Sequence, residues 1–265
     1  MARSLSPTLA AVVEELELDQ TPVVTMGLLH EIADRNQLGT HPKVIAARLR
    51  AQGWLLPTGQ RGVWEFAPGA HAGPYGHGDP TMPLRAALAA DPDLAAALAL
   101  GTAAWARGVA DRVPTTLDVA VPAGVHMPAG LARSASVTTF TSAIGYTTVK
   151  GVPCHRPETV LVHLSAEPGA PRSWGAVAEW LPDLAAEADA QVFAEEVAHR
   201  SRSTKVRAGY LLSGMRPNLA APLASLVGDP VRFGRRTEQL RRHVSTWRVL
   251  DSALPVDPTT WEPLR

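Results

Sequence analysis

The segment 40–66 constrains the fold of this chain most strongly, because a short amphipathic helix is followed at once by two short strands. Apolar residues recur at helical spacing in its first part: Val44, Ile45 and Leu49. We expect Thr40 to cap this helix with its side-chain oxygen, and Pro42 to occupy the first turn. Gly53 is placed to end the helix in a left-handed conformation. A helix that runs into a hairpin in this way is typical of a winged helix-turn-helix.

The second part of the segment predicts the hairpin itself. Its buried side is expected to consist of Trp54, Leu56, Val63 and Phe66. Upstream, residues 7–18 and 23–36 have the apolar periodicity of two more helices, the second capped by Thr25. Three helices followed by a hairpin predict a winged helix-turn-helix over residues 1–68.

The charge of the chain changes sign inside this region. Before residue 35 there are one basic and six acidic residues, whereas residues 35–64 hold five basic residues and no acid. Because cations neutralise phosphates and a few helix side chains read base edges, we expect this region to bind double-stranded DNA. The expected contacts come from the helix start, the helix surface and the hairpin tip: Thr40, His41, Lys43, Arg48, Arg50, Thr58, Gln60 and Arg61.

These residues are expected to play different parts. Lys43 and His41 are the candidates for groove contacts, with Thr40 near a phosphate, whereas Arg48 and Arg50 would bind the backbone. Arg61 would bind the backbone or enter the minor groove. Two other interpretations stay open: an ordinary three-helix module with a solvated basic face, and an adaptor that docks protein instead of DNA.

The overall composition sets further bounds. A length of 265 residues suits two domains, and a formal net charge of zero means that any affinity for nucleic acid must come from local patches. Cys154 is the single cysteine, so an internal disulfide is excluded and we expect a cytoplasmic protein. No segment reaches the roughly 20 apolar residues that cross a membrane. His41, His71 and His77 match no standard metal spacing, and we expect neither a metal nor a cofactor.

A Gly- and Pro-rich stretch at residues 69–82 predicts a linker or long loop, which leaves residues 83–265 as a second domain. That domain is expected to be mixed α/β, which makes the whole chain α+β. Strands are predicted at 117–121, 136–140 and 146–152, and helices from 157 and over 174–180, 182–199, 203–213 and 217–227. Residues 231–250 fit either structure, and we favour strands there.

This second domain has its own charge pattern, an acidic block at residues 165–199 followed by a basic block at 200–248. The two blocks could neutralise each other within one fold. Alternatively, the basic block forms a second anionic contact with flanking DNA, tRNA or the acidic surface of a protein partner. The residues of that second contact would be Arg200, Arg202, Lys205, Arg207, Arg235, Arg236, Arg241 and Arg242.

An enzyme is the competing class of protein. The best local candidate is Cys154-His155-Arg156 with Glu158, which offers a thiol, a base and an acid. Adjacent residues in a strand point to opposite faces, so Cys154 and His155 are poorly placed to share a site. Phosphate-binding loop, serine-hydrolase and zinc-protease motifs are absent from the sequence. We therefore expect no catalytic residues.

The order of several motifs resembles the AbiEi-like antitoxins and transcriptional regulators of type IV (AbiE) toxin–antitoxin systems. The motifs are Leu49-x3-Gly-Trp-Leu55, Arg61-Gly-Val-Trp-Glu-Phe-Ala-Pro68, Gly101-Thr-Ala-Ala-Trp-x2-Gly108, Val119-Ala-Val-Pro-x-Gly124, Pro153-x3-Pro-Glu158 and Arg207-Ala-Gly-Tyr-Leu-Leu212. Together they span most of the chain, and their shared order is more specific than any one of them. The loop at residues 69–82 is longer than the resemblance implies.

The resemblance implies an N-terminal winged helix that represses its own operon at inverted repeats. It also implies a C-terminal domain that neutralises a nucleotidyltransferase-like toxin. A monomer in solution could then bind in pairs on DNA. A stand-alone winged-helix regulator is the alternative within the DNA-binding class.

Overall fold

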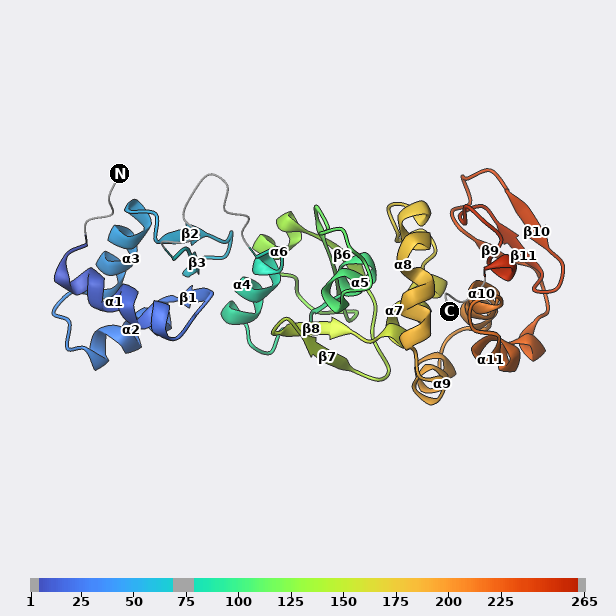
Figure 1. Cartoon of the computed structure of the whole chain (residues 1–265), viewed down its shortest axis with the longest axis horizontal. Coiled ribbons are helices and arrows are strands. Elements are labelled where there is room, and N and C mark those ends of the chain that lie inside the picture. The colour runs from blue at the N-terminus through green and yellow to red at the C-terminus, as the bar shows by residue number, and fades with distance from the viewer. Residues whose placement is uncertain (1–4, 69–78, 262–265) are drawn as a thin grey trace. The chain divides into compact units, whose positions relative to one another are not determined.

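The computed structural model describes residues 5–68 and 79–261. The chain forms two compact units (Figure 1): Met1–Ala95 with Val125–Ala135, and Ala96–Gly124 with Ser136–Arg265. Helices and three separate sheets make up the described residues, so the expected α+β class is confirmed. The expected division into residues 1–68, 69–82 and 83–265 stays a prediction, and residues 69–78 of its linker lie outside the described residues.

The first unit begins with three helices and a three-stranded antiparallel sheet of order β1-β3-β2. These elements are α1 (Pro7–Leu18), β1 (Val23–Thr25), α2 (Met26–Arg35), α3 (Pro42–Ala51), β2 (Leu55–Pro57) and β3 (Val63–Phe66). Their shared core is apolar and includes the fully buried side chains of Val12, Leu29, Ile45 and Leu49. Each helix is too short to be stable alone, so this core holds them together.

The structure corrects two local predictions in this unit and confirms a third. Residues 23–25 form a strand instead of the start of a helix. The helix begins only after Thr25, whose side chain caps α2 by accepting from the Leu28 N–H at 3.1 Å. Leu56 is 40 % exposed, and Leu55 is buried in its place. Since successive side chains of a strand alternate between faces, the prediction was off by one residue in β2. Trp54, Val63 and Phe66 are buried as predicted. The left-handed conformation of Gly53 is confirmed, with φ of 74°.

Two further helices complete the first unit, α4 (Met82–Ala90) and α6 (Ala129–Ser134). Helix α4 packs against β1, β3 and α6. The turn between β2 and β3 packs closely against α6. The approach is so close that a Cβ added to Gly130 would lie only 2.7 Å from the Gly59 carbonyl oxygen. A segment that follows Val121 in the sequence is therefore part of the same compact unit as the N-terminal helices.

The second unit is built around a five-stranded sheet of order β6-β5-β4-β8-β7. Its strands are β4 (Ala97–Leu98), β5 (Leu117–Val121), β6 (Ala135–Thr139), β7 (Tyr146–Val149) and β8 (Val152–His155). Strands β4 and β8 are parallel, whereas β7 and β8 form an antiparallel hairpin. The expected single strand over residues 146–152 is wrong, because Lys150 and Gly151 both take positive φ and turn the chain.

Helices accompany this sheet: α5 (Leu100–Arg107), α7 (Pro157–Ala166), α8 (Trp174–Glu187), α9 (Ala190–Ala198), α10 (Arg202–Leu212) and α11 (Pro217–Ala220), with 3-10 turns at Ala221–Leu226 and Pro258–Thr260. Helix α7 packs against α5, α8, α9 and α10 and is buried along its length up to Ser165. Helix α8 continues through Pro182, contrary to the predicted break. The break lies at Asp189, whose carboxylate accepts from the N–H groups of Gln191 and Val192.

A small third sheet lies beside α10 (Figure 1). It consists of β9 (Val231–Phe233), β10 (Arg242–Val244) and β11 (Val249–Asp251), in the order β10-β11-β9. The predicted strands within residues 231–250 are therefore confirmed. The ring of Trp247 covers Gly209 of α10, where a Cβ would lie 2.3 Å from the indole.

Candidate nucleic-acid interface

Helix α3 has one apolar and one basic face. Its buried residues are Pro42, Ile45, Ala46 and Leu49, and they pack into the core of the first unit. The exposed residues of the helix are Lys43, Val44, Ala47, Arg48, Arg50 and Ala51. The predicted place of Val44 in the buried stripe is wrong, since its side chain is 42 % exposed. The outward face of α3 therefore presents three cations around small apolar side chains.

The cations of this face have no carboxylate partner in the described part of the chain. Within residues 5–68 and 79–261, no acidic group lies within ion-pair distance of Lys43, Arg48 or Arg50. Arg35 differs from them, because its guanidinium lies 3.2 Å from the carboxylate of Glu15 on α1. Segment 35–64 has five basic residues. Among the described residues, the cations on α3 and Arg61 are the ones that remain available to an external anion.

The start of α3 is organised by His41 rather than by Thr40. The prediction that Thr40 caps the helix is wrong: His41 is the N-cap, and its Nδ1 accepts from the Lys43 N–H at 3.2 Å. Because Nδ1 is the acceptor, the neutral ring carries its proton on Nε2. The exposed edge of His41 is therefore a hydrogen-bond donor at the N-terminus of α3.

The hairpin tip divides into a structural part and an exposed part. The Thr58 hydroxyl donates to the Val63 carbonyl at 2.9 Å and accepts from the Gln60 N–H, which shapes the turn. The side chain of Gln60 lies against Gly130 of α6, and its amide nitrogen is buried. Arg61 is exposed and is the one cation of the tip.

The basic block of the second unit has mostly internal partners. Arg200 donates to the Thr141 carbonyl, pairs with Glu196 and lies over the ring of Phe140. Arg202, Lys205 and Arg207 each donate to backbone carbonyls of neighbouring segments. These four side chains therefore join elements of the fold to one another. Their predicted role as an anionic contact stays a prediction.

The remaining four cations of the block, Arg235, Arg236, Arg241 and Arg242, lie after β9 and in β10. Arg235 donates to the Gly169 carbonyl at 2.9 Å, and Arg242 donates to the Leu254 carbonyl at 2.9 Å. Arg236 and Arg241 are exposed, with no side-chain partner among the described residues. This part of the block is the more accessible one.

The candidate thiol and base of an enzyme, Cys154 and His155, are not activated in this fold. Burial raises the pKa of the Cys154 thiol to about 11, and burial lowers the pKa of His155 to about 3. Glu158 accepts from the Asp189 N–H at 2.7 Å, where it orders the start of α9. The thiol stays protonated near pH 7, and an imidazole of such low pKa is too weak a base to take its proton, so these groups form no nucleophile–base pair.

Two other kinds of site can be assessed for the described residues. No group of three His, Cys, Asp or Glu side chains within residues 5–68 and 79–261 is arranged to hold a metal ion. His71 and His77 lie outside that range. No helix in the described part of the chain is long and apolar enough to cross a membrane.

Comparison with known proteins identifies the second unit. Residues 95–214 match the model of the AbiEi antitoxin C-terminal domain. This part of the chain is AbiEi-like. The resemblance drawn from the motifs is thereby confirmed, and the AbiEi domain supports an antitoxin role, which implies a toxin as partner. The comparison with curated proteins found no match.

One solved structure is similar to nearly the whole chain. The crystal structure of the RV2827C protein from Mycobacterium tuberculosis is similar, with a TM-score of 0.78 and 25 % sequence identity. The match covers 96 % of the AbiEi-like chain and 94 % of that protein. It therefore includes the first unit, most of which lies outside the AbiEi model.

Proposed function

We propose that this AbiEi-like protein is a DNA-binding antitoxin that represses its own operon. Its N-terminal segment, up to residue 68, would act as a winged helix-turn-helix. The observation that carries the proposal is the outward face of α3, where Lys43, Arg48 and Arg50 have no acidic partner among the described residues.

The order of elements supports the winged-helix interpretation. Helices α2 and α3 pack against each other, and the β2–β3 hairpin follows α3 directly. In such a module the second helix of the pair enters the major groove. Residues near the start of α3 would then face base edges, and residues further along it would lie nearer the phosphates.

The side chains on α3 suit these two roles. Lys43 and the Nε2 donor of His41 lie at the helix start, where acceptors of purine bases would meet them. Val44 and Ala47 offer apolar contact to a thymine methyl group. Arg48 and Arg50 would bind phosphates, and Arg61 would reach the backbone or the minor groove from the hairpin. Gln60 is not part of the proposed contact, because its amide is buried against α6.

The test is fluorescence anisotropy with the chain's own upstream promoter and a scrambled duplex, over a series of salt concentrations. Tight, salt-dependent binding that prefers the promoter supports the proposal. Equal affinity for both duplexes, or no binding at low salt, contradicts it and favours a protein-docking adaptor. The number of chains bound per inverted repeat tests the paired binding of monomers.

Matched variants locate the contact. Arg48→Ala should weaken binding to all duplexes and reduce the slope of log affinity against log salt by about 0.9 for each phosphate that is no longer neutralised. Lys43→Ala should change which duplex is preferred. Arg35→Ala is the control, because Glu15 already neutralises this arginine. If Arg35→Ala weakens binding as much as Arg48→Ala does, the contact lies elsewhere on the first unit.

The antitoxin half of the proposal concerns the second unit. The AbiEi domain would neutralise a nucleotidyltransferase-like toxin encoded beside it. Co-expression of that neighbouring gene with this chain should restore growth, whereas the neighbouring gene alone should arrest it. Growth arrest that persists in the presence of the chain would contradict an antitoxin function for this pair.

A further inference from the structure

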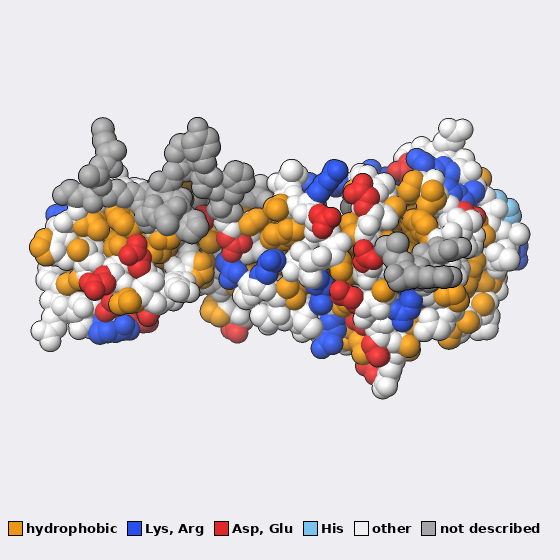
Figure 2. Space-filling model, in the orientation of Figure 1, with side chains coloured by type: hydrophobic (Ala, Val, Ile, Leu, Met, Phe, Trp, Pro, Cys, Tyr) orange, Lys and Arg blue, Asp and Glu red, His pale blue; other side chains and the backbone are white. Residues whose placement is uncertain are grey.

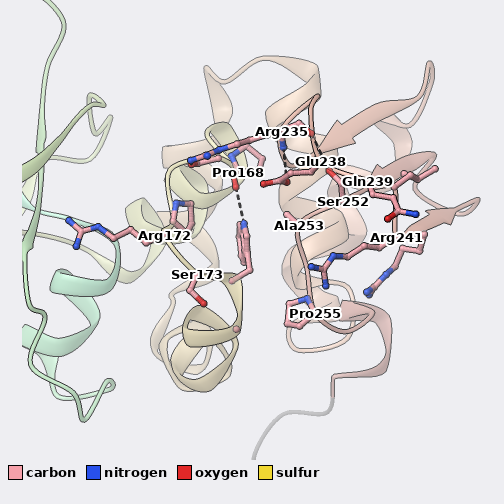
Figure 3. Close-up of a pocket in the computed structure, with 16 residues that line it drawn as sticks. Pro168, Arg172, Ser173, Arg235, Glu238, Gln239, Arg241, Ser252, Ala253 and Pro255 are labelled. Carbon is pink, nitrogen blue, oxygen red and sulfur yellow. Dashed lines mark hydrogen bonds between the residues drawn. The ribbon is translucent and has the colours of Figure 1, made fainter.

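A cavity of about 900 Å³ lies in the second unit, between the α7–α8 connection and the segment around β10 (Figure 3). One wall consists of Pro168, Gly169 and residues 171–175, and the other of residues 235, 238–242, 252, 253 and 255. Its size is in the range of pockets that hold small molecules. The cavity is outside the proposed DNA contact.

The charge of the lining is positive. Four arginines line the cavity, Arg172, Arg235, Arg241 and Arg242, against the single carboxylate of Glu238. Arg172 points away from the opposite wall in Figure 3, and its charge partly offsets the burial that raises the pKa of Asp118. Lys and Arg side chains also gather over this end of the second unit in Figure 2.

Two of the arginines keep donors that the fold does not use. The side chain of Arg241 is exposed and has no partner within the described part of the chain. Arg242 is held by the Leu254 carbonyl at 2.9 Å and by Asp251 at 3.5 Å, but its second terminal nitrogen is buried without a hydrogen bond. That nitrogen is enclosed by protein, so Arg241 supplies the accessible guanidinium donors of this wall.

The α8 helix adds donors on the opposite wall. Ser173 caps this helix, which runs for 14 residues, and Trp174 and Gly175 are its first two residues. The first N–H groups of a helix have no carbonyl partner within the helix and favour an anion. The cavity therefore has anion-binding groups on both of its walls.

The walls are fixed in place by hydrogen bonds. Arg235 joins them by donating to the Gly169 carbonyl, while Glu238 accepts from the Arg235 N–H at 3.1 Å. The indole of Trp174 donates to the Pro168 carbonyl at 2.8 Å and packs against Phe233. A site that is already ordered binds its ligand without the entropic cost of arranging these side chains.

We infer that this cavity binds a terminal phosphate joined to a nucleoside, either on a free nucleotide or on the 5′ end of a single strand. Guanidinium groups meet phosphate oxygens in two parallel hydrogen bonds. Pro171, Pro255 and Leu240, which is 46 % exposed, provide apolar surface for a base. A DNA duplex presents its phosphates on a convex surface, which does not fit into a cavity.

Calorimetric titration of the full chain tests this inference with pyrophosphate, ATP and a short oligothymidylate with or without a 5′ phosphate. Binding of ATP alone identifies a free nucleotide, and preference for the phosphorylated oligonucleotide identifies a strand end. Arg241→Gln should weaken whichever probe binds by at least tenfold. Arg236→Gln is the control, because Arg236 is exposed near the cavity but does not line it.

A second variant guards against a merely structural effect. Gln239→Glu places a negative charge on the lining and should also weaken binding by at least tenfold, with an unchanged melting temperature. The combined Lys43→Ala, Arg48→Ala and Arg50→Ala variant should bind the probes normally, which separates this site from the proposed DNA contact. The inference is overturned if no phosphate probe binds, if a polyglutamate peptide binds more tightly than all of them, or if both cavity variants bind normally.

Discussion

His155 lies in a buried group of rings, with Tyr146 stacked 5.7 Å away and Phe140 and His163 at its edges. Both of its ring nitrogens lack a hydrogen bond within the described residues, and burial lowers its pKa to about 3. In the unfolded chain a histidine titrates near pH 6.5. Between these values the unfolded state binds a proton that the folded state does not.

The free energy of unfolding should therefore fall as the pH drops below 6.5, by about 1.4 kcal/mol per pH unit for this residue. His155→Phe keeps a ring in the stack but removes the titration. The free energy of unfolding, measured with urea, should differ less between pH 7.5 and pH 5.5 in this variant than in the unaltered protein, by about 1.4 kcal/mol. An exposed-site control, His199→Phe, should leave the difference unchanged.

His41 allows a second prediction at the scale of one residue, because it both caps α3 and faces outward. His41→Ala should lower the free energy of unfolding by about 1 kcal/mol through loss of the cap. His41→Asn restores a cap but lacks the outward Nε2 donor. If His41 contacts DNA as proposed, both variants should lose promoter affinity, while only His41→Ala loses stability in thermal unfolding. Normal promoter binding by His41→Asn would leave His41 as a cap alone.

At this scale the sequence predicted which cations lie on the outer surface of α3, because helical periodicity alone determines that face. It could not predict which arginines have internal partners. Arg200 reaches the carbonyl of Thr141, 59 residues away, and Arg35 reaches Glu15 across two helices. Such pairings depend on tertiary contacts, which local patterns do not encode.

At the scale of elements, Gly209 of α10 gives a prediction that opposes helix propensity. Alanine in place of a helical glycine normally stabilises a helix by about 1 kcal/mol. Here a Cβ would lie 2.3 Å from the Trp247 ring, so Gly209→Ala should displace the small sheet from α10. We expect a loss of about 1–3 kcal/mol in urea unfolding.

The matched control is Gly101→Ala in α5, where the nearest atom to a Cβ is 3.5 Å away. Its stability should be unchanged or higher. Combining Gly209→Ala with Trp247→Leu should cost less than the sum of the two single changes, because the clash is then absent. Additive losses would mean that the indole does not determine the effect.

The elements that could be predicted from the sequence are those with their own period or caps. Helices α1 to α3 and the hairpin belong to this group. Strand β1 has only three residues, and its partner β3 lies about 40 positions along the chain, so no local signal marks it. Helix α6 has only six residues, and its place in the first unit depends on contacts with α4 and with the turn at Gly59.

At the scale of the whole molecule, the two proposed activities belong to different compact units, so we expect them to be separable. The combined Lys43→Ala, Arg48→Ala and Arg50→Ala variant should lose promoter binding. Expressed from an unrelated promoter, it should still restore growth in cells that produce the neighbouring toxin. The measurements are anisotropy on the promoter duplex and growth rate during co-expression.

Point variants are the right tool for this test, because the units are not two consecutive pieces of chain. The AbiEi match begins at residue 95 but includes α6, which packs within the first unit. A fragment that ends at residue 95 would lack α6 and expose the surface that Gly130 covers beside Gly59. A loss of function in such a fragment would therefore report misfolding. Loss of growth rescue by the well-folded triple variant would instead show that α3 takes part in neutralisation, and that repression and antitoxin action share one surface.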